Sequence, residues 1–133
     1  MQKTCLRCRE CKKEYESTFK YICDECFGPL DVHYNFASLR KNTFVNREQT
    51  YWRYFELLPI ADKSYIISIN AGMTPLVKAE KLGKEIGLNN LYIKNDSVNP
   101  TFSFKDRQAG VAVSKAKEFG LESVGCAYTG NLA

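Results

Sequence analysis

The chain has 133 residues, 44% of them hydrophobic, and a formal net charge of +4 at pH 7. This length suits one ordinary domain or two small units, and the positive charges are spread out rather than gathered into the block typical of nucleic-acid binding. The longest apolar run, residues 65–69, is too short to span a membrane, and the first residues lack the apolar region of a signal peptide. We therefore expect a cytoplasmic protein whose partners include neither a membrane nor a nucleic acid.

Four of the six cysteines form two matched C-x-x-C motifs near the start of the chain. Both motifs have the form Cys-x-Glu-Cys, and an apolar residue stands two positions before each. Zinc prefers four thiolates in structural sites, and the segment between the motifs is long enough for a hairpin that brings them together. Four protein ligands would leave no open position, so we expect a structural zinc site. The expected ligands are Cys8, Cys11, Cys23 and Cys26.

The remaining cysteines and the single histidine leave alternatives open. A disulfide framework is the main rival to zinc, but no secretory signal accompanies these cysteines. Cys5 also forms a C-x-x-C with Cys8, although the matching flanks favour Cys8 and Cys11. His33 is most simply a polar strand residue, and it could replace a cysteine that does not bind. Cys126 lies in an apolar, strand-like run and is expected to be a buried, inert thiol.

The first half of the chain is predicted to contain two parts. Alternation of apolar residues over 30–34 predicts a strand, which would complete a zinc-ribbon-like β unit over residues 1–35. Residues 36–50 are polar and aperiodic, as expected of a linker. Apolar residues at helical spacing then predict a short aromatic helix before Pro59. Linker and helix together are assigned to residues 36–70.

Helices and apolar strands alternate after residue 70, which is typical of an α/β domain with a mostly parallel sheet. The predicted elements are a Gly-rich turn over 71–75, a helix that ends at Gly87, a strand over 91–94, a helix from Lys105 to Phe119, and a strand over 123–127. Leu82 and Ile86 of the first helix are expected to face inward. The apolar face of the second helix consists of Ala109, Ala112, Val113, Ala116 and Phe119. So few strands would leave an unpaired edge and an uncovered face. We therefore expect residues 71–133 to be an incomplete domain, and the chain to be a fragment.

Lys105 is a candidate catalytic residue because of its position. It lies at the expected start of a helix and directly follows Phe102, Ser103 and Phe104. The positive end of a helix dipole and apolar neighbours both disfavour a protonated amine, and a neutral amine is a nucleophile. The structural alternative is a lysine whose stem packs at the helix start while its amine reaches water.

Several segments together resemble a known family. The cysteine motifs, "YWRYFELLPI", "AGMTPLV", "LYIKNDSVNPTFSFKDR" and "TGN", in this order, are similar to the N-terminal part of threonine synthase, a fold-type-II pyridoxal-phosphate enzyme. The resemblance implies an α/β fold class, in which a zinc-ribbon-like β unit precedes the start of a three-layer domain like that of tryptophan synthase β, here truncated. It implies pyridoxal 5′-phosphate as cofactor and O-phospho-L-homoserine as substrate, which reacts with water to give L-threonine and phosphate.

The same resemblance implies roles for individual residues. Lys105 would hold the cofactor covalently and then act as an acid and base, and Phe104 would lie near the cofactor ring, although a core position fits it nearly as well. Asn131 would donate to the 3′ oxygen of the cofactor, and Thr129 would belong to the loop that holds the substrate carboxylate. Tyr128 replaces a common serine in that loop. The phosphate-binding loop is expected further along, so the 133-residue chain alone is expected to be inactive.

Other functions remain open at this stage. Cysteate synthase resembles threonine synthase closely but uses phosphoserine and sulfite, and other fold-type-II lyases share the lysine and asparagine motifs. The cysteine ribbon argues against threonine dehydratase and cysteine synthase, but it does not separate the first two enzymes. A zinc-ribbon interaction module or a non-catalytic remnant is an alternative of a different class. The sequence leaves the oligomeric state open, with a homodimer of the full-length protein as one candidate.

Overall fold

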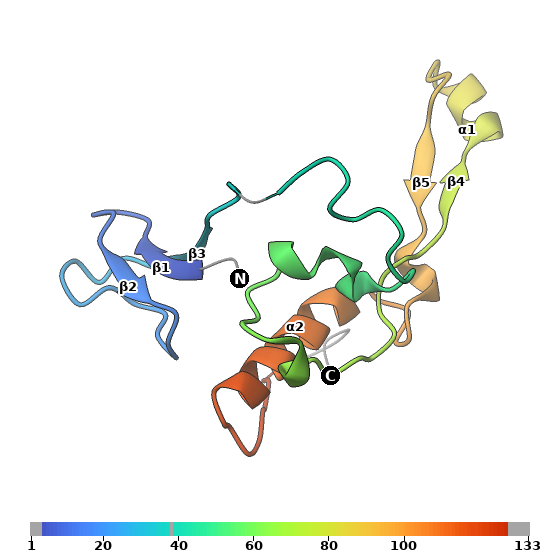
Figure 1. Ribbon diagram of the computed structural model, residues 1–133. Coiled ribbons are helices and arrows are strands. Elements are labelled where there is room, and N and C mark those ends of the chain that lie inside the picture. The colour runs from blue at the N-terminus through green and yellow to red at the C-terminus, as the bar shows by residue number, and fades with distance from the viewer. Residues whose placement is uncertain (1–3, 38, 128–133) are drawn as a thin grey trace.

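The computed structural model describes residues 4–37 and 39–127. Figure 1 shows a small β unit on one side, a central helix α2, and a projecting hairpin that carries the short helix α1. Within the described residues, no helix is both long and apolar enough to cross a membrane.

The β unit is a three-stranded antiparallel sheet. Its strands are β1 (Thr4–Cys8), β2 (Glu14–Glu16) and β3 (Leu30–Tyr34), in the order β2-β1-β3. Leu6 pairs with Tyr15 on one side and Val32 on the other, and it is buried. Because side chains alternate between the faces of a strand, Cys5, Glu16 and His33 share the opposite face. The predicted strand over 30–34 is confirmed.

The segment after β3 contains two short 3₁₀ helices, η1 (Tyr51–Leu57) and η2 (Lys63–Tyr65). The predicted aromatic helix is therefore confirmed, in its tighter 3₁₀ form. Arg47 holds the preceding stretch against η1, since its guanidinium donates to Glu56 at 2.6 and 2.7 Å and to the Arg53 carbonyl at 2.7 Å. The division of the chain at residues 35 and 70 stays a prediction.

The projecting hairpin departs from the predicted parallel sheet. Strands β4 (Leu76–Lys78) and β5 (Tyr92–Lys94) pair antiparallel, with α1 (Glu80–Glu85) between them and the 3₁₀ helix η3 (Asp96–Val98) after them. Every strand pair in the described residues is antiparallel. Helix α1 lies at the end of this hairpin, whereas the helix of a crossover to a parallel neighbour packs on a face of the sheet (Figure 1).

The short helix α1 also exposes the side chains that were expected to face inward. Leu82 and Ile86 are 45% and 54% exposed, because no described element covers this face of the hairpin. The predicted end of the helix is confirmed, since Gly87 has φ +75°, a left-handed conformation that glycine adopts without a Cβ clash.

Helix α2 (Asp106–Glu118) begins and ends where the sequence predicts, with Lys105 as N-cap and Gly120 at φ +69° beyond the end. The predicted apolar face is confirmed only in part. Ala116 is buried and Ala112 is exposed, and the buried stripe also contains Asp106, Gly110 and Ser114. Residues 60–70 run along this helix, since the Ile67 N–H donates to the Ser114 hydroxyl and the Ala61 N–H to the Glu118 carboxylate, both at 2.9 Å.

The predicted strand over 123–127 is absent from the structure. These residues have no regular hydrogen-bonded partner, because no described strand lies beside them. The expectation that Cys126 is buried is wrong as well, since its thiol is exposed.

Candidate functional site

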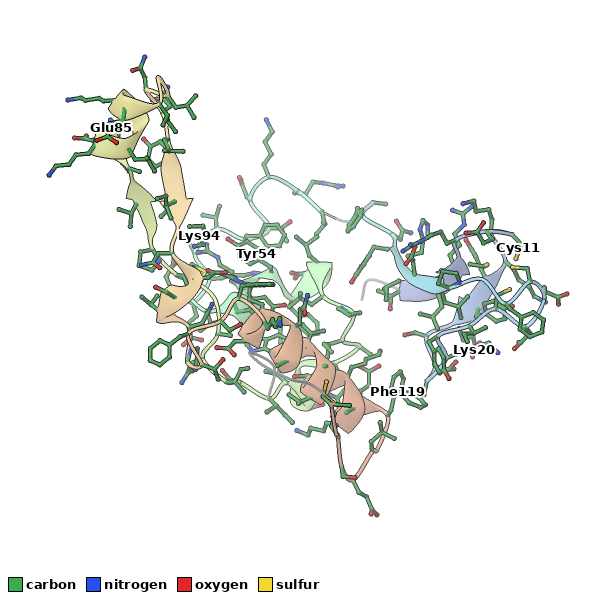
Figure 2. All side chains as sticks on the ribbon, turned by 180° about the vertical axis from the view of Figure 1, so that it is seen from behind. Cys11, Lys20, Tyr54, Glu85, Lys94 and Phe119 are labelled. Carbon is green, nitrogen blue, oxygen red and sulfur yellow. The ribbon has the colours of Figure 1, made fainter. Side chains whose placement is uncertain are left out.

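The four predicted zinc ligands form one cluster. The sulfur atoms of Cys8, Cys11, Cys23 and Cys26 all lie within 4.8 Å of one another. Cys8 and Cys23 are buried, and Cys11 and Cys26 are exposed. Cys5 and His33 are not members of this cluster, so its composition agrees with the choice of Cys8 and Cys11 over Cys5, which stays a prediction. Figure 2 shows sulfur atoms gathered near the label of Cys11, at one end of the β unit.

Each C-x-x-C motif folds into the same turn. In the first turn the Lys12 N–H donates to the Cys8 carbonyl at 3.2 Å, and in the second the Phe27 N–H donates to the Cys23 carbonyl at 3.1 Å. The amides of Cys8 and Cys23 in turn donate to the carbonyls five residues later, at 2.8 and 2.9 Å. Lys12 and Phe27 both adopt left-handed φ angles, 65° and 59°. The two turns are therefore equivalent although neither carries a glycine at this position.

The packing of the second turn requires glycine at residue 28. A Cβ there would lie 2.8 Å from Cγ of Glu10 and 3.0 Å from the sulfur of Cys8. Gly28 thus lets the second turn approach the first closely enough for the four sulfurs to meet.

The thiols of the cluster hold their protons unequally. A hydrogen bond from Tyr15 lowers the pKa of Cys23 to about 6, against the opposing effect of burial. Burial would raise the pKa of Cys8, but hydrogen bonds that its sulfur accepts from the Cys11 backbone and from the Cys26 thiol outweigh burial and lower the pKa. A backbone hydrogen bond from Lys13 lowers the pKa of Cys11, yet burial and its neighbouring thiols raise it overall to about 12. A bound cation would have to displace the proton of Cys11.

A second candidate site surrounds Lys105, at the start of α2. Lys105 is half-buried, and its backbone N–H donates to the hydroxyl of Ser103 at 3.3 Å. Asp106 closes the preceding loop, because its carboxylate accepts from the Thr101 N–H at 2.8 Å and the Thr101 hydroxyl at 2.5 Å. The loop that carries Lys105 is therefore tied to the first turn of α2.

Arg107 joins this helix start to two other segments. Its guanidinium donates to both carboxylate oxygens of Asp96, at 3.1 and 2.8 Å, and to the Thr74 hydroxyl at 3.1 Å. The Thr74 hydroxyl donates to Asp96 at 2.5 Å. These contacts hold the pKa of Asp96 at about 2, with the Arg107 hydrogen bonds as the main cause. Asn99 adds a further tie, since its side chain accepts from the Gly72 N–H at 2.9 Å.

The structure places some predicted site residues and not others. Lys105 lies at the helix start as expected, but Phe102 and Phe104 are 81% and 58% exposed and do not form the expected apolar frame around it. Thr129 and Asn131, as well as Tyr128, lie outside the described residues. Sequence reasoning did not identify Asp96, Arg107 and Thr74 as a network, because they are far apart in the chain and follow no periodic pattern.

Comparisons with known proteins bear on the same residues. The family model described as pyridoxal-phosphate dependent enzyme matches residues 67–133. The chain is 44% identical over 130 residues to a threonine synthase of Methanocaldococcus jannaschii, and 40% identical over 129 residues to one of Methanosarcina acetivorans. These alignments cover 94% and 95% of this chain but 32% and 31% of the relatives.

A threonine synthase of Synechocystis is 44% identical over 79 residues, which are 59% of this chain and 21% of that protein. The chain thus spans about a third of the length of the first two relatives. No solved structure matches the chain. The family match includes the Lys105 loop, α2 and the segment that Asp96 and Arg107 tie together, and on this evidence the chain belongs to the family of pyridoxal-phosphate dependent enzymes.

Proposed function

We propose that this chain is part of a threonine synthase, which converts O-phospho-L-homoserine and water to L-threonine and phosphate. The observation that carries the proposal is the 44% identity to the Methanocaldococcus jannaschii threonine synthase over 94% of this chain. An alignment of this extent must include the second cysteine motif as well as the Lys105 loop. Lyases of the same family with other substrates are weaker candidates, because the relatives reported above are all named threonine synthase.

The residues around Lys105 fit pyridoxal phosphate as cofactor. The family needs one lysine amine for covalent attachment, and Lys105 offers such an amine from a loop that Asp106 and Thr101 hold in place. Phe104 is exposed beside it, so its ring can pack against a flat heteroaromatic ring. Pyridoxal phosphate, when bound, supplies the electron sink for a negative charge that develops on the substrate.

Lys105 is the proposed base and acid of the reaction. Lys105 is the N-cap residue of α2, so its side chain leaves the chain where the loop joins the first turn of the helix. A neutral amine can accept a proton from the α-carbon of the substrate and return one later. The Asp96–Arg107 and Thr101–Asp106 contacts keep the loop in one geometry, which limits the reorganisation that proton transfer requires.

Two further roles rest on the family resemblance alone. Asn131 would donate to the 3′ oxygen of the cofactor, and Thr129 would contribute to the loop that binds the substrate carboxylate. The three-layer α/β domain of fold type II and the assignment of residues 71–133 to it are likewise proposals, supported by the family match over 67–133. Residues 1–35 are the proposed zinc-ribbon unit and residues 36–70 the connecting part.

The cysteine cluster is the proposed site of a structural zinc ion. Four sulfurs within 4.8 Å of one another match the ligand set and compactness of tetrahedral zinc sites. With four protein ligands, no coordination position remains for a substrate, so the ion would stabilise the β unit rather than take part in the reaction. Cysteines kept as thiols favour a reducing compartment, which supports the proposal of a cytoplasmic location.

The activity is tested with the complete gene product that carries this sequence. We expect phosphate release from O-phospho-L-homoserine with formation of threonine, and loss of both in Lys105→Ala. The control is Lys81→Ala, which alters an exposed lysine on α1. Activity with phosphoserine and sulfite instead would favour cysteate synthase, and binding of cofactor without turnover of either substrate would favour a non-catalytic remnant.

Attachment of the cofactor is tested separately by reduction with borohydride after incubation with pyridoxal phosphate, followed by peptide mapping. We expect the label on Lys105, together with an absorbance band of the bound cofactor. A label spread over surface lysines, Lys81 included, would contradict the proposed role of Lys105 whatever the outcome of the activity assay.

A further inference from the structure

Tyr15 is the one side chain other than cysteine that hydrogen-bonds a sulfur of the cluster, within residues 4–37 and 39–127. It lies in the middle of β2, where it pairs with Leu6 of β1, and its ring is half-buried. Its hydroxyl oxygen is 3.0 Å from the sulfur of Cys23. No zinc-ligand motif predicts this contact, because Tyr15 lies between the two C-x-x-C turns and belongs to neither.

The direction of this hydrogen bond follows from the chemistry of its two atoms. The Asp24 N–H donates to the same hydroxyl oxygen at 3.1 Å, so one lone pair of that oxygen is already used. A cysteine that binds a metal is a thiolate, which has no proton to give. With a metal present, the Tyr15 O–H must therefore be the donor and the Cys23 sulfur the acceptor.

Cys23 consequently receives two hydrogen bonds, one from Tyr15 and one from the Glu25 N–H at 3.4 Å. Four thiolates around a divalent cation leave a net charge of about −2, which donors to sulfur disperse. Cys23 is fully buried, so water cannot provide this donor in place of Tyr15. The ring that carries the hydroxyl also contacts two cations, with the amine nitrogen of Lys20 at 5.0 Å and that of Lys13 at 5.7 Å from its centroid.

Both lysines form ion pairs with acidic residues of the β unit. Lys20 donates to both oxygens of Asp24 at 2.6 Å, and Lys13 forms an ion pair with Glu25. Asp24 and Glu25 are the two residues between the cysteines of the second turn. The ring and the hydroxyl oxygen of Tyr15 thereby contact one connected set of groups, which places the hydroxyl beside the sulfur of Cys23.

We propose that Tyr15 is a positioning residue of the metal site, whose hydroxyl donates to the Cys23 thiolate, orients this ligand and reduces the negative charge on its sulfur. The proposal rests on the proposed metal site. Hydrogen bonds from outside the ligand shell commonly change metal affinity by 10- to 100-fold, so loss of this hydroxyl should weaken zinc binding by about tenfold. It should also leave the Cys23 sulfur a stronger electron donor to the metal.

The test compares Tyr15→Phe with the wild-type chain, both loaded with Co²⁺ and, separately, with Zn²⁺. Phenylalanine keeps the ring that contacts the two lysines and removes only the hydroxyl group. We expect the thiolate-to-cobalt charge-transfer band of Tyr15→Phe at longer wavelength, and about tenfold weaker zinc binding in competition with a chromophoric chelator. The control is Tyr21→Phe, whose side chain in the same hairpin is 72% exposed, and whose band and affinity should equal those of the wild type.

An unchanged band and affinity in Tyr15→Phe would overturn the proposal while leaving the metal site intact. A wild-type chain that binds neither ion would overturn the metal site and this proposal with it. If Tyr15→Phe does not fold, the wild type loaded with ¹¹³Cd decides by NMR. Coupling from cadmium to the Tyr15 hydroxyl proton across the hydrogen bond would support the proposal, and coupling to the Glu25 amide proton alone would contradict it.

Discussion

Asp96 accepts hydrogen bonds from Arg107 on α2 and from Thr74 before β4, so a single carboxylate connects three segments of the chain. We expect Asp96→Asn to lower the free energy of unfolding by about 2 kcal/mol, because a hydrogen bond between charged groups contributes about that much and the amide cannot accept through both atoms. The measurement is urea denaturation at pH 7. Loss of the exposed Lys78–Glu80 pair in Glu80→Gln serves as control and should cost less than about 0.5 kcal/mol.

The pKa of Asp96 also predicts how the free energy of unfolding changes at low pH. The pKa of Asp96 is about 2 in the folded chain, below its ordinary value of 3.8, so its contribution to stability is complete above about pH 4. That contribution is lost as the pH falls towards 2, since protonation then breaks the pair with Arg107. The difference in unfolding free energy between wild type and Asp96→Asn should therefore shrink between pH 4 and pH 2. A difference that stays constant over this range would contradict an ionised Asp96 as its source.

Residues of the site were predictable where their signal is local. Cys8 and Cys11 are three positions apart, a spacing typical of a metal-binding turn, and Cys23 and Cys26 repeat it. The cluster was therefore predictable from the spacing of the cysteines. The pairs Asp96–Arg107 and Tyr15–Cys23 are separated by 11 and 8 positions, with no pattern that links them. Such contacts depend on how distant segments meet in the fold, which a single sequence does not encode in any short motif.

Elements were predictable at their ends more than on their faces. Lys105 and Gly120 bound α2 through local capping chemistry, which sequence patterns capture. The buried stripe of α2 consists of Asp106, Gly110, Ser114 and Ala116, and only Ala116 belongs to the apolar pattern from which the face was predicted. Alternating helices and strands likewise carry no information on strand direction, and the pair β4–β5 is antiparallel where a parallel sheet was expected.

The hairpin of β4 and β5 depends on Gly83 in α1. This glycine is buried, and an added Cβ would lie 2.4 Å from the carbonyl oxygen of Leu88, which is closer than real atoms approach. We expect Gly83→Ala to weaken the hairpin by about 2 kcal/mol even though alanine is the better helix former, because the turn after α1 must shift. Hydrogen exchange at the Leu88 amide, which donates to the Gly83 carbonyl at 2.8 Å, reports the change.

The matched control for that prediction is Lys84→Ala, which alters the next residue of the same helix on its exposed side. It should leave exchange at the Leu88 amide unchanged within about twofold. Equal exchange in Gly83→Ala and Lys84→Ala would show that the close approach at Leu88 does not constrain the hairpin.

In the second cysteine turn, a substitution is expected to raise the stability of the protein rather than lower it. Phe27 holds a left-handed φ of 59° with its side chain 80% exposed, so it carries backbone strain with little packing in return. A left-handed residue with a Cβ costs about 1–2 kcal/mol, and glycine loses about 0.5–1 kcal/mol through its greater freedom in the unfolded chain. We expect Phe27→Gly to stabilise the zinc-loaded β unit by about 0.5 kcal/mol, measured by thermal unfolding at fixed zinc concentration. A lower melting temperature would show that the Phe27 side chain makes a stabilising contact.

At the scale of the whole molecule, the described residues bury two small and separate cores. Leu6, Cys8 and Cys23 are the buried apolar residues of the β unit, whereas Ile60, Ala71 and Ala116 belong to α2 and the segment along it. Two side-chain contacts connect these cores, both made by residues that directly follow β2. Phe19 packs edge-on against Phe119 with ring centroids 5.9 Å apart, and Lys115 donates to Ser17 at 3.3 Å. Figure 2 shows Phe119 at the end of α2 that lies towards Lys20 and the β unit.

These two cores should respond differently to metal removal. Two of the three buried apolar residues in the β unit are proposed zinc ligands, so without the ion only Leu6 remains to hold the sheet. Chelation should therefore abolish exchange protection of the β1 and β3 amides. An aromatic pair contributes about 0.5–1.5 kcal/mol, so α2 should lose at most about tenfold protection, and only in its last turn.

Phe19→Ala distinguishes the effect of losing the zinc ion from the effect of losing the Phe19–Phe119 contact. The zinc-loaded variant should keep the protection of β1 and β3 but show the same loss in the last turn of α2 as the chelated wild type, because in both cases the Phe19–Phe119 pair is gone. If chelation instead exposed α2 along its whole length, from Asp106 to Glu118, the two cores would be one cooperative unit. The metal site would then stabilise the helix that begins at Lys105 directly, rather than only the sheet that carries its ligands.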